Sequence, residues 1–215
     1  MSNVVPDPAA SAPDPVRILN LANGLTILRM ALVPVFAVLL LTGDGQDPTM
    51  RLVAALVFTG AVITDRFDGM IARQRNLITE FGKVADPIAD KALIGTALVA
   101  LSLLDLMPWW VTAVIVFREV AVTVLRFWVI RHGVIAASRG GKIKTVVQAA
   151  AIGLYILPLS GFFGTVRWWV LAAALILTVV TGIDYVVRAL RLRRTSARAM
   201  LRAEQARAQR THEST

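Results

Sequence analysis

Six apolar segments, each close to twenty residues long, restrict what this chain can fold into. They run roughly over residues 25–42, 50–71, 85–105, 108–130, 144–163 and 166–188. A helix that crosses the hydrocarbon core of a bilayer needs ~20 apolar residues. Backbone groups in lipid must hydrogen-bond to one another, so such segments form helices. The pattern predicts an all-α, polytopic membrane protein built as a bundle of six transmembrane helices.

The composition agrees with a membrane protein that uses no thiol chemistry. Hydrophobic residues make up 56% of the 215 residues, and cysteine is absent. The chain therefore has no disulfide, no thiol nucleophile and no thiolate metal site. Its formal net charge of +9 is explained by loop charge and anionic lipid. Nucleic acid is not an expected partner, because no stretch combines aromatic and basic residues as single-strand binders do.

Basic residues are concentrated in alternate connections between the apolar segments. Lysine and arginine gather at 73–83, at 131–144 and in the C-terminal stretch. The other three connections have only Arg51 and Arg167 at their edges, and two of them carry aspartates, namely Asp44, Asp47 and Asp105. By the positive-inside rule, the basic connections and both termini lie in the cytoplasm. We therefore expect a multi-pass protein of the plasma (inner) membrane with its acidic residues near the cytoplasmic face.

The chain divides into three expected parts. Residues 1–16, rich in Pro, Ala and Ser, predict a disordered tail without a signal-peptide pattern. Residues 17–190 form the membrane domain, and its first stretch, 17–26, predicts a short interfacial helix. Residues 191–215 form a basic cytoplasmic tail, which is either solvated or in contact with anionic headgroups.

Four aspartates interrupt the apolar pattern around the second connection. Asp65 and Asp68 are three residues apart and Asp86 and Asp90 are four apart, so each pair shares one helix face. The short connection makes the two helices antiparallel neighbours, and both pairs then meet at the cytoplasmic end. Carboxylates so close together need protons or a cation. Oxygen ligands without His or Cys favour Mg²⁺, Mn²⁺ or Ca²⁺, as one ion or two.

Small and basic residues lie beside these aspartates. Gly69 and Ala72 share the face of the first pair, and Gly82 begins the next helix, which leaves room for a ligand near the backbone. Arg73 follows Gly69 by one turn and can reach a phosphate. Each of these residues has an ordinary alternative role in packing or at a helix end. Paired intramembrane carboxylates, in contrast, are usually functional.

The stretch from Asp65 to Asp90 reads D-x2-D-G-x2-A-R-x8-G-x3-D-x3-D. It resembles, without departure, the signature of the CDP-alcohol phosphatidyltransferases, and the resemblance extends over roughly residues 17–188. It implies the six-helix fold of that family, a homodimer, and two divalent cations, Mg²⁺ or Mn²⁺. The implied metal ligands are Asp65, Asp68, Asp86 and Asp90, and Asp90 is also the implied catalytic base. The implied CDP-lipid site consists of Asn23, Thr26, Asp68, Gly69, Ala72, Arg73 and Gly82.

Three further stretches indicate the acceptor. "NLANGLTILR" (20–29), "FREVAVTVLR" (117–126) and "ASRGGKIKTVVQ" (137–148) resemble the branch of the family that uses glycerol 3-phosphate. The resemblance implies an enzyme of phospholipid biosynthesis that transfers a phosphatidyl group from CDP-diacylglycerol to sn-glycerol 3-phosphate, giving phosphatidylglycerophosphate and CMP. A phosphorylated acceptor needs a cationic site. The candidate residues for it are Arg118, Arg126, Arg139, Lys142 and Lys144, which have an alternative role as positive-inside anchors.

Two other functions stay open from the sequence. The first is a sister transferase whose acceptor is an inositol phosphate, inositol or phosphatidylglycerol. The second is a non-enzymatic membrane protein that binds cations at the acidic cluster. The second function does not explain the fixed spacing of Gly69, Ala72, Arg73 and Gly82.

Overall fold

The computed structural model describes residues 21–74, 79–129 and 139–213, and these residues form helices joined by short turns, with no strand among them. The elements are α1 (Leu21–Leu41), the short 3-10 helix η1 (Thr42–Gly45), α2 (Pro48–Gln74), α3 (Glu80–Leu103), α4 (Trp109–Val129), α5 (Arg139–Ile156) and α6 (Gly161–Glu213). The prediction of an all-helical protein is confirmed.

Each predicted apolar segment coincides with one long helix, but several boundaries differ. α3, α5 and α6 begin before the predicted segments, and α6 continues to Glu213, through most of the stretch predicted as a C-terminal tail. The fifth helix ends at Ile156, seven residues before its predicted end, because Pro158 follows and disfavours helix in the residue before it. Of the stretch predicted as an interfacial helix, residues 21–26 form the first turns of α1. Residues 17–20 lie outside the described residues, as does the predicted N-terminal tail.

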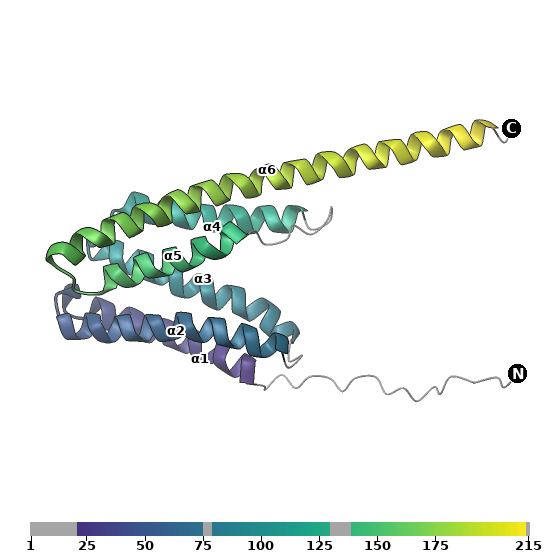
Figure 1. Cartoon of the computed structure of the whole chain (residues 1–215). Coiled ribbons are helices and arrows are strands. Elements are labelled where there is room, and N and C mark those ends of the chain that lie inside the picture. The colour runs from purple at the N-terminus through teal and green to yellow at the C-terminus, as the bar shows by residue number, and fades with distance from the viewer. Residues whose placement is uncertain (1–20, 75–78, 130–138, 214–215) are drawn as a thin grey trace, which may run out of the picture.

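The helices run alternately up and down, and Figure 1 shows how their ends are grouped. α1 packs against α2 and α3, while α5 packs against α2 and α6, and α4 packs against α6. One end of the bundle carries the beginnings of α1, α3 and α5 and the ends of α2 and α4 (Figure 1). We call it the site end, because the predicted aspartates lie there. α6 continues past it to Glu213.

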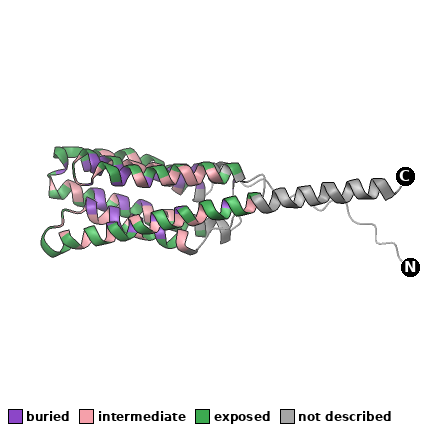
Figure 2. Ribbon diagram, turned by 90° about the horizontal axis from the view of Figure 1, so that it is seen from above, coloured by how far each residue is buried: buried purple, intermediate pink, exposed green. Residues whose placement is uncertain are grey.

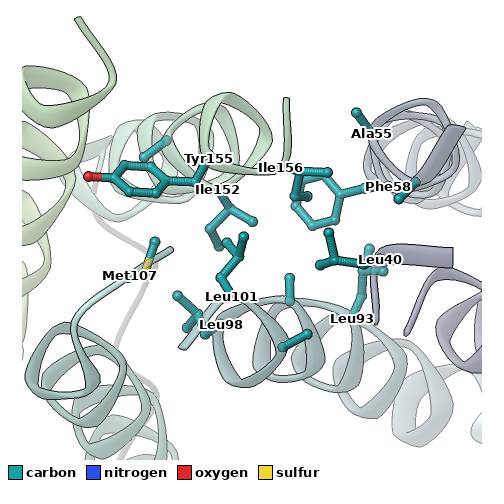
Figure 3. Close-up of a cluster of buried hydrophobic side chains, with 14 of the residues drawn as sticks. Leu40, Ala55, Phe58, Leu93, Leu98, Leu101, Met107, Ile152, Tyr155 and Ile156 are labelled. Atoms are coloured by element: carbon teal, nitrogen blue, oxygen red, sulfur yellow. The ribbon is translucent and has the colours of Figure 1, made fainter. Parts of the chain in front are cut away.

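Apolar side chains between the helices form one continuous core. Phe58 of α2, Leu98 of α3 and Ile152 of α5 are almost fully buried, and Figure 3 shows side chains from several helices converging there. Alanines at helix contacts, such as Ala97 and Ala151, are also fully buried. Small residues let membrane helices approach closely. The core therefore combines large interlocking apolar side chains with close helix contacts at alanines.

The outer faces are apolar as well. Every helix has exposed residues, and Figure 2 shows them along the outside of the bundle. Large apolar side chains are among them, with Phe117 76%, Phe162 77% and Trp169 74% exposed. Apolar surface of this extent is typical of contact with lipid. Two helical stretches within the described ranges, Asn23–Gly45 and Gly161–Arg193, are long and apolar enough to cross a membrane.

Candidate active site

The site end brings three of the four predicted aspartates to the junction of α1, α2 and α3. Asp65 lies in the last three turns of α2, and Asp86 and Asp90 lie in the first three turns of α3. Asp65 and Asp90 line one cavity of about 560 Å³, together with Arg29 of α1. The predicted meeting of α2 and α3 carboxylates is thus present for this pair. The side chain of Asp68 lies outside the described residues.

A polar face of α1 holds the two aspartate-bearing helices together. Asn23, Thr26 and Arg29 follow one another at intervals of three, so they share one face of the helix. All three are at most 3% exposed. A helix of a membrane protein buries polar groups only where they have partners, and the partners here come from α2 and α3.

Arg29 and Thr26 each bind one of the predicted metal ligands. Arg29 Nη1 donates to Asp65 Oδ1 and forms an ion pair with it. Thr26 Oγ1 donates to Asp86 Oδ1. Fixing a carboxylate oxygen by a hydrogen bond orients the remaining lone pairs, as outer partners do around metal ligands. Thr26 was predicted for the CDP-lipid site, whereas Arg29 was not among the predicted site residues. Its spacing from Asn23 and Thr26 was the signal that could have identified it.

Asn23 and Gly82 approach each other at the beginning of α3. Asn23 Nδ2 donates to Thr79 Oγ1 at 2.8 Å, and Thr79 caps α3 by accepting from the Gly82 backbone N–H at 3.0 Å. A Cβ atom placed on Gly82 would lie 2.9 Å from Asn23 Oδ1. A side chain at position 82 therefore forces its neighbours to move. The two predicted residues are neighbours, and Thr79, which was not predicted, joins them.

Several predicted site residues cannot be placed at the level of side chains. Gly69, Ala72 and Arg73 belong to α2 and Arg139 begins α5, but their side chains lie outside the described residues. Their assignment to the CDP-lipid and acceptor sites therefore stays a prediction.

A second, smaller cavity adjoins Asp90 on the side of α4 and α5. Its volume is about 170 Å³, and its polar lining includes Asp90, Glu119, Lys144 and Gln148. Lys144 is 4% exposed and its ammonium group forms an ion pair with Glu119. Within the described part of the chain, no hydrogen bond or ion pair engages the Asp90 carboxylate. Asp90 therefore lies between two cavities with an uncommitted carboxylate.

The other predicted acceptor residues are placed differently. Arg118 donates to Thr181 of α6 at 2.9 Å and to Glu119 at 3.2 Å, and it lines a groove between α4 and α6 rather than a cavity at Asp90. Arg126 and Lys142 are exposed, and neither lines a cavity at Asp90. Of the candidates whose side chains are described, Lys144 is the one beside Asp90. Glu119 and Gln148, which were not predicted, accompany it.

The carboxylate oxygens of the site are suitable ligands for a hard divalent cation. The described side chains alone do not form a complete set of metal ligands. Among the side chains that the structure describes, no group of three or more acidic or histidine residues is placed to hold a metal. Asp68 is not among them. The carboxylates of Asp65 and Asp90 nevertheless share a cavity, and oxygen donors of this kind fit Mg²⁺ or Mn²⁺.

The fold and the aspartate-bearing helices define the class of protein. Residues 19–180 match the family described as CDP-alcohol phosphatidyltransferase. The chain belongs to this family. The described helices and the family together indicate a membrane protein.

Individual relatives within this family have more specific names. A probable phosphatidylglycerophosphate synthase of Mycobacterium tuberculosis is 59% identical over 175 residues, which cover 81% of this chain and 84% of the relative. A CDP-diacylglycerol–glycerol-3-phosphate 3-phosphatidyltransferase of Bacillus subtilis is 41% identical over 182 residues, covering 77% and 93%. A relative of the same name from Rickettsia bellii is 39% identical over 177 residues, with the same coverage.

Proposed function

We propose that this chain transfers the phosphatidyl group from CDP-diacylglycerol to sn-glycerol 3-phosphate and releases phosphatidylglycerophosphate and CMP. The observation that carries the proposal is the position of Asp90 between two cavities of different character. One is large and mostly apolar, and the other is small and has a buried lysine. The names of the relatives from Mycobacterium, Bacillus and Rickettsia support the same donor and acceptor.

The larger cavity suits the lipid donor. Its walls come from α2 and α5 and include Leu56, Phe58 and Leu154, while Arg29, Asp65 and Asp90 also line it. A lipid with a charged headgroup needs this combination of hydrocarbon and polar surface. We place the acyl chains along the apolar wall and the diphosphate beside the aspartates. Asn23, Thr26, Gly69, Ala72, Arg73 and Gly82 complete the proposed CDP-lipid site.

Asp65, Asp68, Asp86 and Asp90 would hold two divalent cations, Mg²⁺ or Mn²⁺. When bound, such ions offset negative charge on phosphate oxygens during phosphoryl transfer. The chain's own contribution is to hold these carboxylates in place. Arg29 orients Asp65, and Thr26 orients Asp86.

Asp90 acts as the general base on the acceptor. Its carboxylate takes the proton from the primary hydroxyl of sn-glycerol 3-phosphate, whose oxygen attacks the β-phosphorus of CDP-diacylglycerol. The bond from that phosphorus to the bridging oxygen breaks, and CMP leaves with the electron pair. The acceptor phosphate is held by Lys144, with Arg118, Arg126, Arg139 and Lys142 as further cationic candidates. A charge-assisted contact to a buried ammonium is suited to this task.

The proposal includes a membrane arrangement. Six helices, α1 to α6, span the bilayer, with the site end and both termini in the cytoplasm, and the protein forms a homodimer. The placement of lysine and arginine supports the orientation. The family resemblance supports the dimer.

The test is CMP release by purified protein in mixed micelles with CDP-diacylglycerol and Mg²⁺ or Mn²⁺. Glycerol 3-phosphate, inositol 1-phosphate, inositol and phosphatidylglycerol are supplied one at a time. We expect release with glycerol 3-phosphate and its loss when the metal is chelated. Release with another acceptor alone would identify a sister transferase, and no release with any acceptor would favour the cation-binding alternative.

A further inference from the structure

The small cavity beside Asp90 is lined by helices α3, α4 and α5. Leu98 of α3 and Ile115 of α4 are at most 1% exposed and make part of its wall apolar. Leu98 is eight residues beyond Asp90, which is about two helical turns. The cavity therefore extends from the carboxylate of Asp90 into the apolar interior of the bundle.

Gln148 lies in this apolar interior, and its side-chain oxygen has no partner within the described ranges. It is 4% exposed and lines the cavity. Its Oε1 atom has no hydrogen-bond partner among the residues that the structure describes. Gln148 follows Lys144 by four residues, so the two side chains share one face of α5. A buried amide oxygen that lacks a partner is costly, so a ligand group that donates a hydrogen bond to it would be stabilised there.

The other polar side chains of the cavity are already engaged. The pairs are Lys91 with Thr123, Glu119 with Lys144, and Thr145 with the backbone carbonyl of Gly141. Among the described residues of this cavity, Asp90 and Gln148 are left with uncommitted polar groups. Two uncommitted groups and the ammonium groups of Lys91 and Lys144 therefore line one small cavity.

We propose that Gln148 is a specificity-determining residue that hydrogen-bonds the secondary hydroxyl of the acceptor. The inference rests on the proposed function. sn-Glycerol 3-phosphate has a phosphate, a secondary hydroxyl and a primary hydroxyl, and the cavity offers Lys144, Gln148 and Asp90. A hydroxyl both donates and accepts, so it satisfies the amide in either orientation.

A hydrogen bond between Gln148 and the secondary hydroxyl would make the enzyme select acceptors that carry this hydroxyl. A site built to hydrogen-bond a hydroxyl rejects an analogue without it, because its own polar group is then left unpaired. 3-Hydroxypropyl phosphate keeps the phosphate and the primary hydroxyl and lacks the secondary hydroxyl. The wild-type protein should therefore discriminate against it, and Gln148 should be the source of the discrimination.

The experiment compares kcat/KM for the two acceptors in the wild-type protein and in Gln148→Leu. Leucine fills a similar volume without a polar group. We expect a loss of about ten- to hundredfold with sn-glycerol 3-phosphate and of less than about threefold with 3-hydroxypropyl phosphate. Gln46→Leu, which changes an exposed glutamine outside the cavity, serves as the matched control and should change neither value.

Two results would overturn the inference while leaving the proposed function intact. An equal loss with both acceptors would make Gln148 a structural residue. No loss with either would show that its amide does not contact the acceptor. Gln148→Met, with a flexible apolar side chain, provides a second variant if the leucine variant does not fold. A wild-type protein that releases no CMP with sn-glycerol 3-phosphate would instead refute the proposed function, and the inference with it.

Discussion

At the scale of single residues, the three site aspartates whose side chains are described, Asp65, Asp86 and Asp90, differ in what they bind. Asp65 is paired with the buried guanidinium of Arg29, and Asp86 accepts from Thr26. Asp90 has no such partner within the described ranges and reaches both cavities. A carboxylate that must accept a proton needs a free lone pair directed at the substrate. Of the three, Asp90 is the one with an uncommitted carboxylate.

The first prediction concerns Asp90→Asn. An amide cannot act as a base, so CMP release should fall by about 10²–10⁴-fold, while the melting temperature in detergent stays near the wild-type value. Asp184→Asn is the control, because Asp184 lies in α6 and pairs with Arg188. Activity of Asp90→Asn close to that of the control would remove Asp90 from the role of base.

The spacing of residues in the sequence identified some of the site residues but not others. Intervals of three and four residues between aspartates identified the acidic faces of the second and third helices. The same intervals connect Asn23, Thr26 and Arg29, and they would have placed Arg29 in the site. Nothing in local spacing connects Glu119 with Lys144, because their ion pair joins α4 and α5.

At the scale of elements, the beginning of α3 depends on close contact with α1. The Thr79 cap and the Asn23 side chain meet over Gly82, where a Cβ would lie 2.9 Å from Asn23 Oδ1. This contact sets how α1 lies against α3, and Asp86 follows Gly82 by one turn. The position of a predicted metal ligand therefore depends on the absence of a side chain.

The second prediction is that Gly82→Ala displaces Asn23 and weakens the contact between α1 and α3. The free energy of unfolding should fall by about 1–3 kcal/mol, and CMP release should fall with it. Thermal unfolding in detergent, together with the release assay, measures both effects. Gly60→Ala is the control, because nothing lies within 4 Å of a Cβ at Gly60. Equal stability of the two variants would contradict the role of Gly82.

The end of α5 is held by a side chain from α2. The Arg51 guanidinium donates to the backbone carbonyls of Tyr155, Ile156 and Leu157 at 2.8–3.0 Å. The last carbonyls of a helix have no partner within it, so Arg51 supplies the missing donors. The contact joins α2 to α5, the two helices that line most of the large cavity.

The third prediction is that Arg51→Met destabilises the protein by about 1–3 kcal/mol, the range for buried carbonyls that lose a charged donor. The melting temperature should fall, and remaining folded protein should keep its KM for the acceptor, since Arg51 lies far along α2 from Asp65. Arg188→Met is the control, because Arg188 is exposed and pairs with Asp184 on the same helix. An unchanged melting temperature for Arg51→Met would show that water replaces the lost donors.

At the scale of the whole molecule, the helix ends are arranged so that the site and the basic segments share one end. The beginnings of α3 and α5 and the end of α2 lie together in Figure 1. The turns between α1 and α2, α3 and α4, and α5 and α6 lie at the other end. If the site end is cytoplasmic, water-soluble substrate and product reach the aspartates without crossing the membrane.

The fourth prediction tests this orientation with cysteines, which the natural chain lacks. In intact cells, a membrane-impermeant thiol reagent should label Ser160→Cys, in the turn between α5 and α6. It should label Ser138→Cys, in the basic connection before α5, only after the membrane is opened. Both changes replace serine by a residue of similar size. Labelling of both, or of Ser138→Cys alone, would contradict the proposed orientation.

The helical class, the six apolar segments and the spacing of the aspartates can be read from the sequence alone. These properties are local, because each depends on residues within one or two turns of a helix. The helix boundaries were predicted less well, because Pro158 ends the fifth helix early and α6 continues to Glu213 beyond its apolar segment.

Which side chains meet across helices became known from the packed structure. Arg29 binds Asp65, Lys144 binds Glu119, and Arg118 turns toward Thr181 of α6. Helices that are apolar on nearly every face have no polar side to show which face points inward, so their rotation about the long axis cannot be predicted from local pattern. Packing sets that rotation, and with it the unpartnered position of Gln148 in the small cavity.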